Sequence, residues 1–170
     1  MHNAHDNERW TVLLISCSIL WCLSFSYDVP SVLHDSLQEY SGLSEVEFSW
    51  YFNSLYAAYS LPNLILPLLF GYYADLKSAN VLILSLAVVS CLGQGLLACG
   101  ILYRVHWLSI SSRFIFGVGC ESLSVALSSV LTRYFTGKEL AFALALSVSS
   151  ARLGMQLHEC PILSLRNYYQ

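Results

Sequence analysis

The stretch that decides the fold is SANVLILSLAVVSCLGQGLLACGILY, residues 78–103, which contains no charged side chain. About 20 consecutive apolar residues make a helix long enough to cross the hydrocarbon core of a membrane. Residues 10–27 and 48–74 are also free of charge. These three runs predict membrane-spanning helices.

The composition of the whole chain supports this prediction. Of its 170 residues, 56% are hydrophobic and only 11% are charged, whereas about 25% are charged in an ordinary soluble domain. The charged residues are too few to cover a soluble fold of this size. The net charge of −3 argues against binding to nucleic acid, which needs a basic patch. We therefore expect an integral membrane protein with no nucleic-acid partner.

Two further spans carry isolated charges. The fourth span contains Arg113 and Glu121, and the fifth contains Arg152. The predicted fold class is an all-α membrane protein, a partial helical bundle of about five transmembrane helices. The predicted spans lie near residues 10–27, 48–73, 79–103, 108–132 and 140–157. Residues 1–9 precede this half-bundle of residues 10–154, and residues 155–170 form a divergent tail.

The basic residues predict the orientation of the spans, because short cytoplasmic loops are enriched in Lys and Arg. With a cytosolic N-terminus, four basic residues fall on the cytosolic side: Arg9, Lys77, Arg133 and Lys138. Arg104 alone falls on the opposite side. The loop 28–47 shares that side and holds five acidic residues but no Lys or Arg. We expect residues 1–9 to be cytosolic.

Small residues that recur every four positions allow membrane helices to approach closely. Three such stripes are present: Ala141, Ala145 and Ser149; Ala143, Ser147 and Ala151; and Ser124, Ser128 and Thr132. Pro62 and Pro67 fall inside the second span and should bend it. We expect these features to serve helix packing.

Three ionisable residues lie inside predicted spans, where they are costly and face protein or water rather than lipid. Arg113 and Glu121 are about 12 Å apart along one helix, too far for a direct pair. Glu121 offers an anion, and Arg152 offers a planar fork suited to carboxylates. Together they match a zwitterion, with an ammonium at Glu121 and a carboxylate at Arg152. The alternative is that they pair with each other, or with Arg113, and hold the bundle together.

The second span also carries a polar face. Its members follow helical spacing: Asn53, Tyr56, Tyr59 and Asn63. Such residues line a water-filled cavity or form hydrogen bonds between helices. The sequence contains no recognisable nucleophile–base pair and no metal-ligand spacing. We therefore expect a protein that is not an enzyme, with no catalytic residue, metal or cofactor.

Several motifs resemble those of the major facilitator superfamily. Gly71-Tyr-Tyr-Ala-Asp75 resembles the family's signature between helices two and three, although Leu76 stands where that signature has Arg. Arg113-Phe-Ile-Phe-Gly117-Val-Gly119 resembles its helix-four motif. Three further segments narrow the resemblance to the branch of lysosomal dipeptide uniporters: residues 56–63, 135–140 and 151–154.

The resemblance implies a transporter of twelve helices in two halves, which exports cationic or neutral dipeptides from the lysosome to the cytosol by alternating access. Carried over by position, Glu121 would hold the amino end of the peptide and Arg152 the carboxyl end. Further substrate-site candidates are Tyr56, Tyr59 and Asn63. Structural or conformational roles fall to Arg113, Gly71, Asp75, Gly117 and Gly119.

The expected partners are a dipeptide, the lipid bilayer of the lysosomal membrane and a glycosylated lysosomal accessory membrane protein, with a homodimer as a further arrangement. Five spans are fewer than the six of one half-transporter, so we expect a truncated chain or a fragment. Two alternatives stay open. One is a transporter of the same fold for another small solute, and the other is a non-transporting form that binds a full-length relative.

Overall fold

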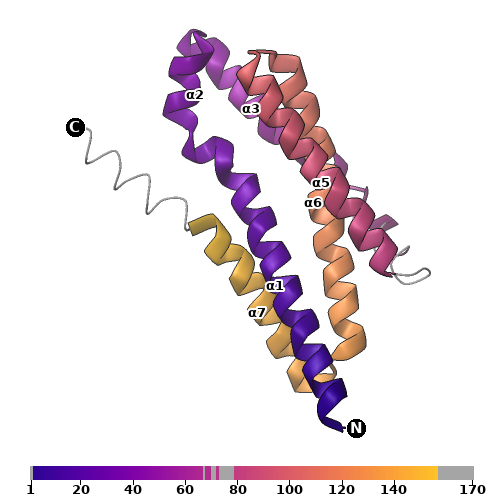
Figure 1. Cartoon of the computed structure of the whole chain (residues 1–170). Helices are drawn as coiled ribbons and strands as arrows, with labels where there is room; N and C mark the ends of the chain where they lie inside the picture. Colours follow the sequence, from indigo (N-terminus) through magenta and orange to yellow (C-terminus); the bar gives the residue numbers. More distant parts are fainter. Residues whose placement is uncertain (1, 67, 70–71, 73–78, 157–170) are drawn as a thin grey trace. The chain divides into compact units, whose positions relative to one another are not determined.

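The described part of the chain is built from helices (Figure 1). The computed structural model describes residues 2–66, 68–69, 72 and 79–156, and these contain no strand. The helices are α1 (His2–Val32), α2 (His34–Ser41), α3 (Glu45–Asn63), α5 (Ala79–Leu102), α6 (His106–Tyr134) and α7 (Gly137–Gln156). The prediction of an all-α membrane protein is confirmed.

Among the described residues, three helices are long and apolar enough to cross a membrane. These segments are Glu8–Val32, Asn80–Leu102 and His106–Tyr134. The sequence predicts five spans, and the two others correspond to α3 and α7. α3 carries Asn53 and Asn63, and α7 has Lys138 and Glu139 in its first turn and Arg152 near its end. These polar residues lower the hydropathy of both helices.

The acidic loop 28–47 contains helical segments, although it has no apolar run that would predict them. α1 continues to Val32, and α2 follows within the loop. α3 then begins at a capping box, in which the Ser44 hydroxyl accepts a hydrogen bond from the Glu47 backbone N–H and the Glu47 carboxylate accepts one from the Ser44 backbone N–H. The hydrogen bonds from the Ser44 hydroxyl and backbone hold the pKa of the Glu47 carboxyl below its usual value.

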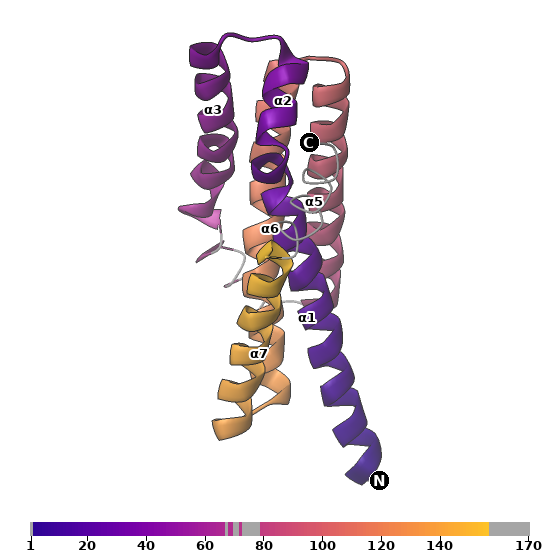
Figure 2. The ribbon, with the colours of Figure 1, turned by 90° about the vertical axis from the view of Figure 1, so that its left-hand side faces the viewer.

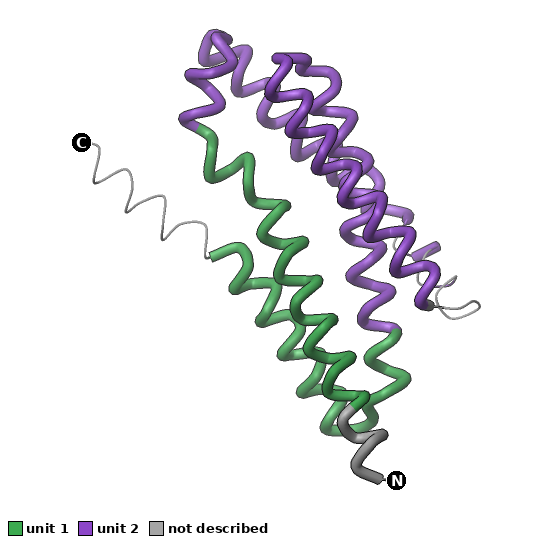
Figure 3. Tube along the Cα trace, in the orientation of Figure 1, with its two compact units in different colours: residues 1–34, 130–170 green, residues 35–129 purple. Residues whose placement is uncertain are grey.

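The chain divides into two compact units, coloured separately in Figure 3. The first comprises residues 1–34 and 130–170, and the second comprises residues 35–129. In the first unit α1 and α7 lie side by side (Figures 1 and 2). The core of this unit is formed by Leu13, Leu131, Phe135 and Ala143.

Small residues allow α7 to pack closely on α1. A Cβ atom added at Gly154 would collide with the backbone oxygen of Trp21. The Ser150 hydroxyl donates a hydrogen bond of 2.9 Å to the Cys17 backbone oxygen. Of the two stripes predicted on this helix, the one with Ala143 and Ser147 is buried. The other stripe is exposed along its length: Ala141, Ala145 and Ser149.

In the second unit, α6 packs closely against both α3 and α5 through glycines. A Cβ atom on Gly117 would collide with the Tyr59 backbone oxygen on α3. A Cβ atom on Gly119 would come within 2.8 Å of the Ser90 backbone nitrogen on α5. Positions two residues apart point about 200° apart around a helix. The two glycines therefore serve two opposite faces of α6.

The helix of the second predicted span ends just after its first proline. Pro62 lies in the last turn of α3, which ends at Asn63. Because proline has no N–H to donate, it weakens the helix at this point. The Ile65 N–H donates to the Pro62 oxygen at 3.3 Å, which tightens the turn that follows. Pro67 lies outside the described residues, as do Gly71 and Asp75 of the predicted loop motif.

Candidate functional site

The centre of the candidate site is a contact between α3 and α6. The Tyr59 hydroxyl donates a hydrogen bond of 2.6 Å to the Glu121 Oε1 atom. Tyr59 is 6% exposed, and Glu121 is half-buried. This distance is typical of a strong hydrogen bond from a hydroxyl to a charged carboxylate. The structure therefore brings together two of the predicted substrate-site residues.

The close approach of the two helices depends on Gly117. Gly117 precedes Glu121 by about one helical turn, so both residues lie on the same face of α6. Any side chain at Gly117 would meet the Tyr59 backbone oxygen, and its Cβ atom would lie 3.1 Å from Pro62 Cγ. Without that side chain, α3 comes near enough for the Tyr59 hydroxyl to reach the carboxylate.

The Glu121 carboxylate has spare hydrogen-bonding capacity. Within the described part of the second unit, Tyr59 is its one hydrogen-bond donor, and no basic side chain forms an ion pair with it. A carboxylate can accept about four hydrogen bonds. No ion pair between Glu121 and Arg113 is found among the described residues. The arrangement suits an incoming group with a positive charge and several N–H donors.

Arg113 is held by an aromatic side chain that the sequence analysis did not select. Arg113 is 2% exposed, and its guanidinium carbon lies 5.5 Å from the centre of the Phe116 ring. The Phe116 ring in turn lies 5.8 Å from the ring of Tyr59. Phe116 therefore links the buried cation to the candidate site. Its spacing of three residues from Arg113 is the signal that would have indicated it.

The other polar residues of α3 differ in their burial and in their contacts. Tyr56 is half-buried, and its ring lies 5.3 Å from the ring of Phe52. The Asn63 Oδ1 atom is shielded from solvent and accepts no hydrogen bond from the described residues. Asn53 is exposed. A ligand beside Tyr59 would therefore find an amide oxygen available at Asn63.

Arg152 lies exposed on α7, in the first unit. The ion pair described in that unit is between Arg9 and Glu139, at 2.8 Å, near the N-terminal ends of α1 and α7. Arg152 takes no part in it. The long side chain and fixed fork of Arg152 can bind a carboxylate.

The fold and these motifs define a class of membrane transporter. The model of the Major Facilitator Superfamily matches residues 14–157. The chain belongs to this superfamily, and it is a multi-pass membrane protein.

The curated relatives include three vertebrate proteins named Lysosomal dipeptide transporter MFSD1. The Bos taurus protein is 35% identical over 154 residues, which are 89% of this chain and 32% of the relative. The Danio rerio protein is 36% identical over 153 residues, 88% of this chain and 32% of the relative. The Homo sapiens protein is 34% identical over 150 residues, 86% of this chain and 31% of the relative. The chain thus spans about a third of the length of these relatives. No solved structure matches it.

Proposed function

We propose that this protein carries cationic or neutral dipeptides across the lysosomal membrane to the cytosol, with Glu121 binding the amino end of the peptide. The observation that carries the proposal is the hydrogen bond from Tyr59 to Glu121. It fixes a half-buried carboxylate by a neutral donor, and no cation pairs with the negative charge among the described residues of the second unit. Membership of a transporter family and the names of its relatives support the same function.

The ammonium of a dipeptide fits the free acceptor positions of Glu121. An ammonium has three N–H donors and a full positive charge. In surroundings of low dielectric constant, the attraction between this charge and a carboxylate is stronger than in water. Tyr59 holds the carboxylate in place before the ligand arrives, so less conformational entropy is lost on binding.

Arg152 is assigned to the carboxyl end of the dipeptide, because its guanidinium can form two parallel hydrogen bonds to a carboxylate. Asn63 and Tyr56 are assigned to the peptide group, since an amide oxygen and a hydroxyl match its donor and acceptor. Arg113 is assigned a positioning role through Phe116. Alternating access then exposes the bound zwitterion first to the lumen and then to the cytosol.

The test edits the gene in place, so that the protein is studied at its native length. Efflux of labelled dipeptide, sugar and organic anion is measured from isolated lysosomes. We expect Glu121→Gln and Arg152→Gln each to lower dipeptide efflux about tenfold or more, as expected for the loss of a charged hydrogen bond. The exposed control changes Glu39→Gln and Lys138→Gln should leave efflux unchanged.

Two results would contradict this function. Efflux of a sugar or an organic anion that is insensitive to both variants would favour a transporter for another solute. Co-purification with a full-length relative, without any efflux, would favour a non-transporting binding form. The same purification tests two further proposed partners, a glycosylated lysosomal membrane protein and a second copy of the chain.

A further inference from the structure

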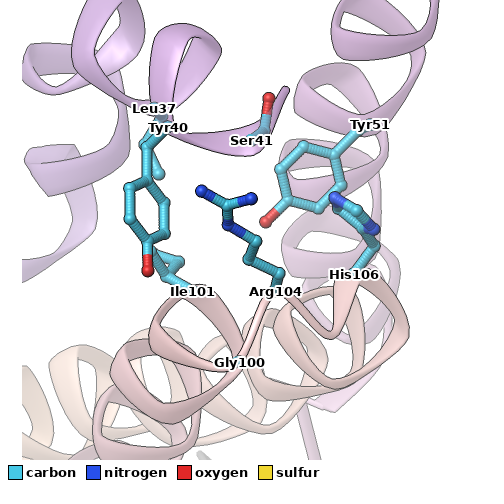
Figure 4. A pocket seen from close by; sticks show the side chains of 8 residues that line it. All are labelled: Leu37, Tyr40, Ser41, Tyr51, Gly100, Ile101, Arg104 and His106. Carbon is cyan, nitrogen blue, oxygen red and sulfur yellow. The ribbon is translucent and has the colours of Figure 1, made fainter. Parts of the chain in front are cut away.

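A small pocket in the second unit lies where α2 and α3 meet the turn between α5 and α6 (Figure 4). Its polar side chains are those of Tyr40, Ser41, Tyr51, Arg104 and His106, and no carboxylate is among the described residues that line it. Its interior has room for about one oxygen-sized atom, and its mouth is open to solvent. Figure 4 shows the guanidinium of Arg104 at the middle of the pocket, between Tyr40 on one side and Tyr51 and His106 on the other.

The Arg104 side chain is held in place by an aromatic ring. Its guanidinium carbon lies 4.6 Å from the centre of the Tyr40 ring. The Tyr40 hydroxyl donates a hydrogen bond of 3.2 Å to the Leu102 backbone oxygen, which anchors the ring. No described acidic residue of the second unit pairs with Arg104. The five N–H donors of its fork, a geometry that matches phosphate, are therefore available to a ligand.

The backbone of Arg104 adopts a conformation that is uncommon for residues other than glycine. Its φ angle is 55°, and it is the one non-glycine residue with a positive φ in the described part of the chain. Glycine adopts this conformation without strain, and a long side chain does not. A residue kept at such a position against its own preference is a reason to look for a role of the side chain.

The surroundings place this pocket at the level of lipid headgroups. The pocket lies where α5 ends and α6 begins, at the ends of two membrane-spanning segments. Tyr103 is 72% exposed and Trp107 is 81% exposed, and they flank Arg104 and His106 in the sequence. Exposed Tyr and Trp at the ends of spans lie at the boundary between the membrane and water.

We propose that this pocket binds the phosphate group of an anionic lipid headgroup. Arg104 donates the main hydrogen bonds from its fork, and His106 adds a ring N–H. The N-terminal end of the α6 helix dipole adds a further attraction for negative charge. A free phosphate ion has the same chemistry. The flanking aromatic residues favour the lipid, because its acyl chains would pack beside them while one phosphate oxygen enters the pocket.

The test uses the protein at its native length, purified in a non-ionic detergent. Binding of phosphatidylglycerol and of phosphatidylcholine with the same acyl chains is counted by native mass spectrometry. We expect phosphatidylglycerol to bind about tenfold more tightly, because the quaternary ammonium beside the phosphate of phosphatidylcholine is repelled by the Arg104 guanidinium. Arg104→Gly should abolish this preference, and Arg133→Gln should keep it.

The glycine variant also separates binding from folding. Because glycine accepts the positive φ, Arg104→Gly should melt at the same temperature as the wild type or at a higher one. Equal binding of the two lipids by the wild type, or an unchanged preference in a folded Arg104→Gly variant, would overturn the proposal. Complete displacement of phosphatidylglycerol by millimolar inorganic phosphate would also overturn it, since the soluble ion would then be the ligand.

Discussion

The Tyr59 hydroxyl and the Glu121 carboxylate lie 2.6 Å apart and join α3 to α6. Among the residues that the structure describes in the second unit, the acid inside the span is thus held by a neutral donor rather than by a basic side chain. Gly117 makes this contact possible, because it removes the side chain that would keep α3 away from α6. The proposed transport function depends on this arrangement.

Tyr59→Phe removes the hydroxyl that holds Glu121. We expect the KM for dipeptide efflux to rise about tenfold, since a hydrogen bond to a charged group is lost. In a Glu121→Gln background the same change should have little further effect, because the two residues act as one unit. The measurement is a double-mutant cycle on efflux, with the exposed Tyr134→Phe as control. Fully additive losses would contradict the coupling.

Gly117→Ala tests the approach of α3 and α6. The new Cβ atom would meet the Tyr59 backbone oxygen, and we expect a loss of about 1–3 kcal/mol in the free energy of unfolding. Gly95→Ala is the matched control, because nothing lies within 4 Å of a Cβ atom at that position of α5. It should stabilise the helix by roughly 0.5–1 kcal/mol. In detergent, a lower melting temperature for Gly117→Ala and a higher one for Gly95→Ala would support the packing described. Equal shifts of the two melting temperatures would contradict it.

Ala143→Leu and Ala145→Leu distinguish the two small-residue stripes of α7. Ala143 is 0% exposed in the core of the first unit, so the larger side chain should cost about 1–3 kcal/mol of unfolding free energy. Ala145 is exposed, and its change should stay within about 0.5 kcal/mol. Thermal unfolding of the two variants gives the comparison. A greater loss at Ala145 would mean that the other stripe is the one that packs.

The capping box of α3 predicts a pH dependence. The pKa of Glu47 is lowered by the hydrogen bonds from Ser44. Its contribution to stability is therefore present above the unfolded-state value of about 4.3 and is lost as the pH falls through the lower folded value. Ser44→Ala removes the hydroxyl, so the pKa of Glu47 should rise towards its usual value. An NMR titration of the Glu47 carboxyl carbon measures this, and identical curves for the two proteins would refute it.

Much of the fold can be predicted from the positions of the charged residues along the sequence. The helix α5 runs over Ala79–Leu102 and α6 over His106–Tyr134, against predicted spans near 79–103 and 108–132. Both are bounded by the polar residues that interrupt the apolar runs. The helix α2 could not be predicted this way, since it lies in an acidic loop without an apolar run.

Only part of the candidate site could be predicted from the sequence. Helical spacing identified the polar face of α3, and an acid inside an apolar run identified Glu121. Spacing along one helix does not show which residue of another helix it faces, so the hydrogen bond between Tyr59 and Glu121 required the structure. For the same reason the sequence could not decide which stripe of α7 is buried. The role of Phe116 was missed because its spacing of three residues from Arg113 is a weak signal, which an aromatic residue of the core can also show.

The most direct test of the central claim is the selectivity for a free amino end. Efflux of a dipeptide is compared with efflux of its N-acetylated form, in the wild type and in Glu121→Gln at the edited gene. If Glu121 binds the ammonium, the wild type should prefer the free amine about tenfold or more, and the variant should transport both forms equally slowly. A variant that keeps the wild-type preference for the free amine would show that Glu121 does not bind the amino end.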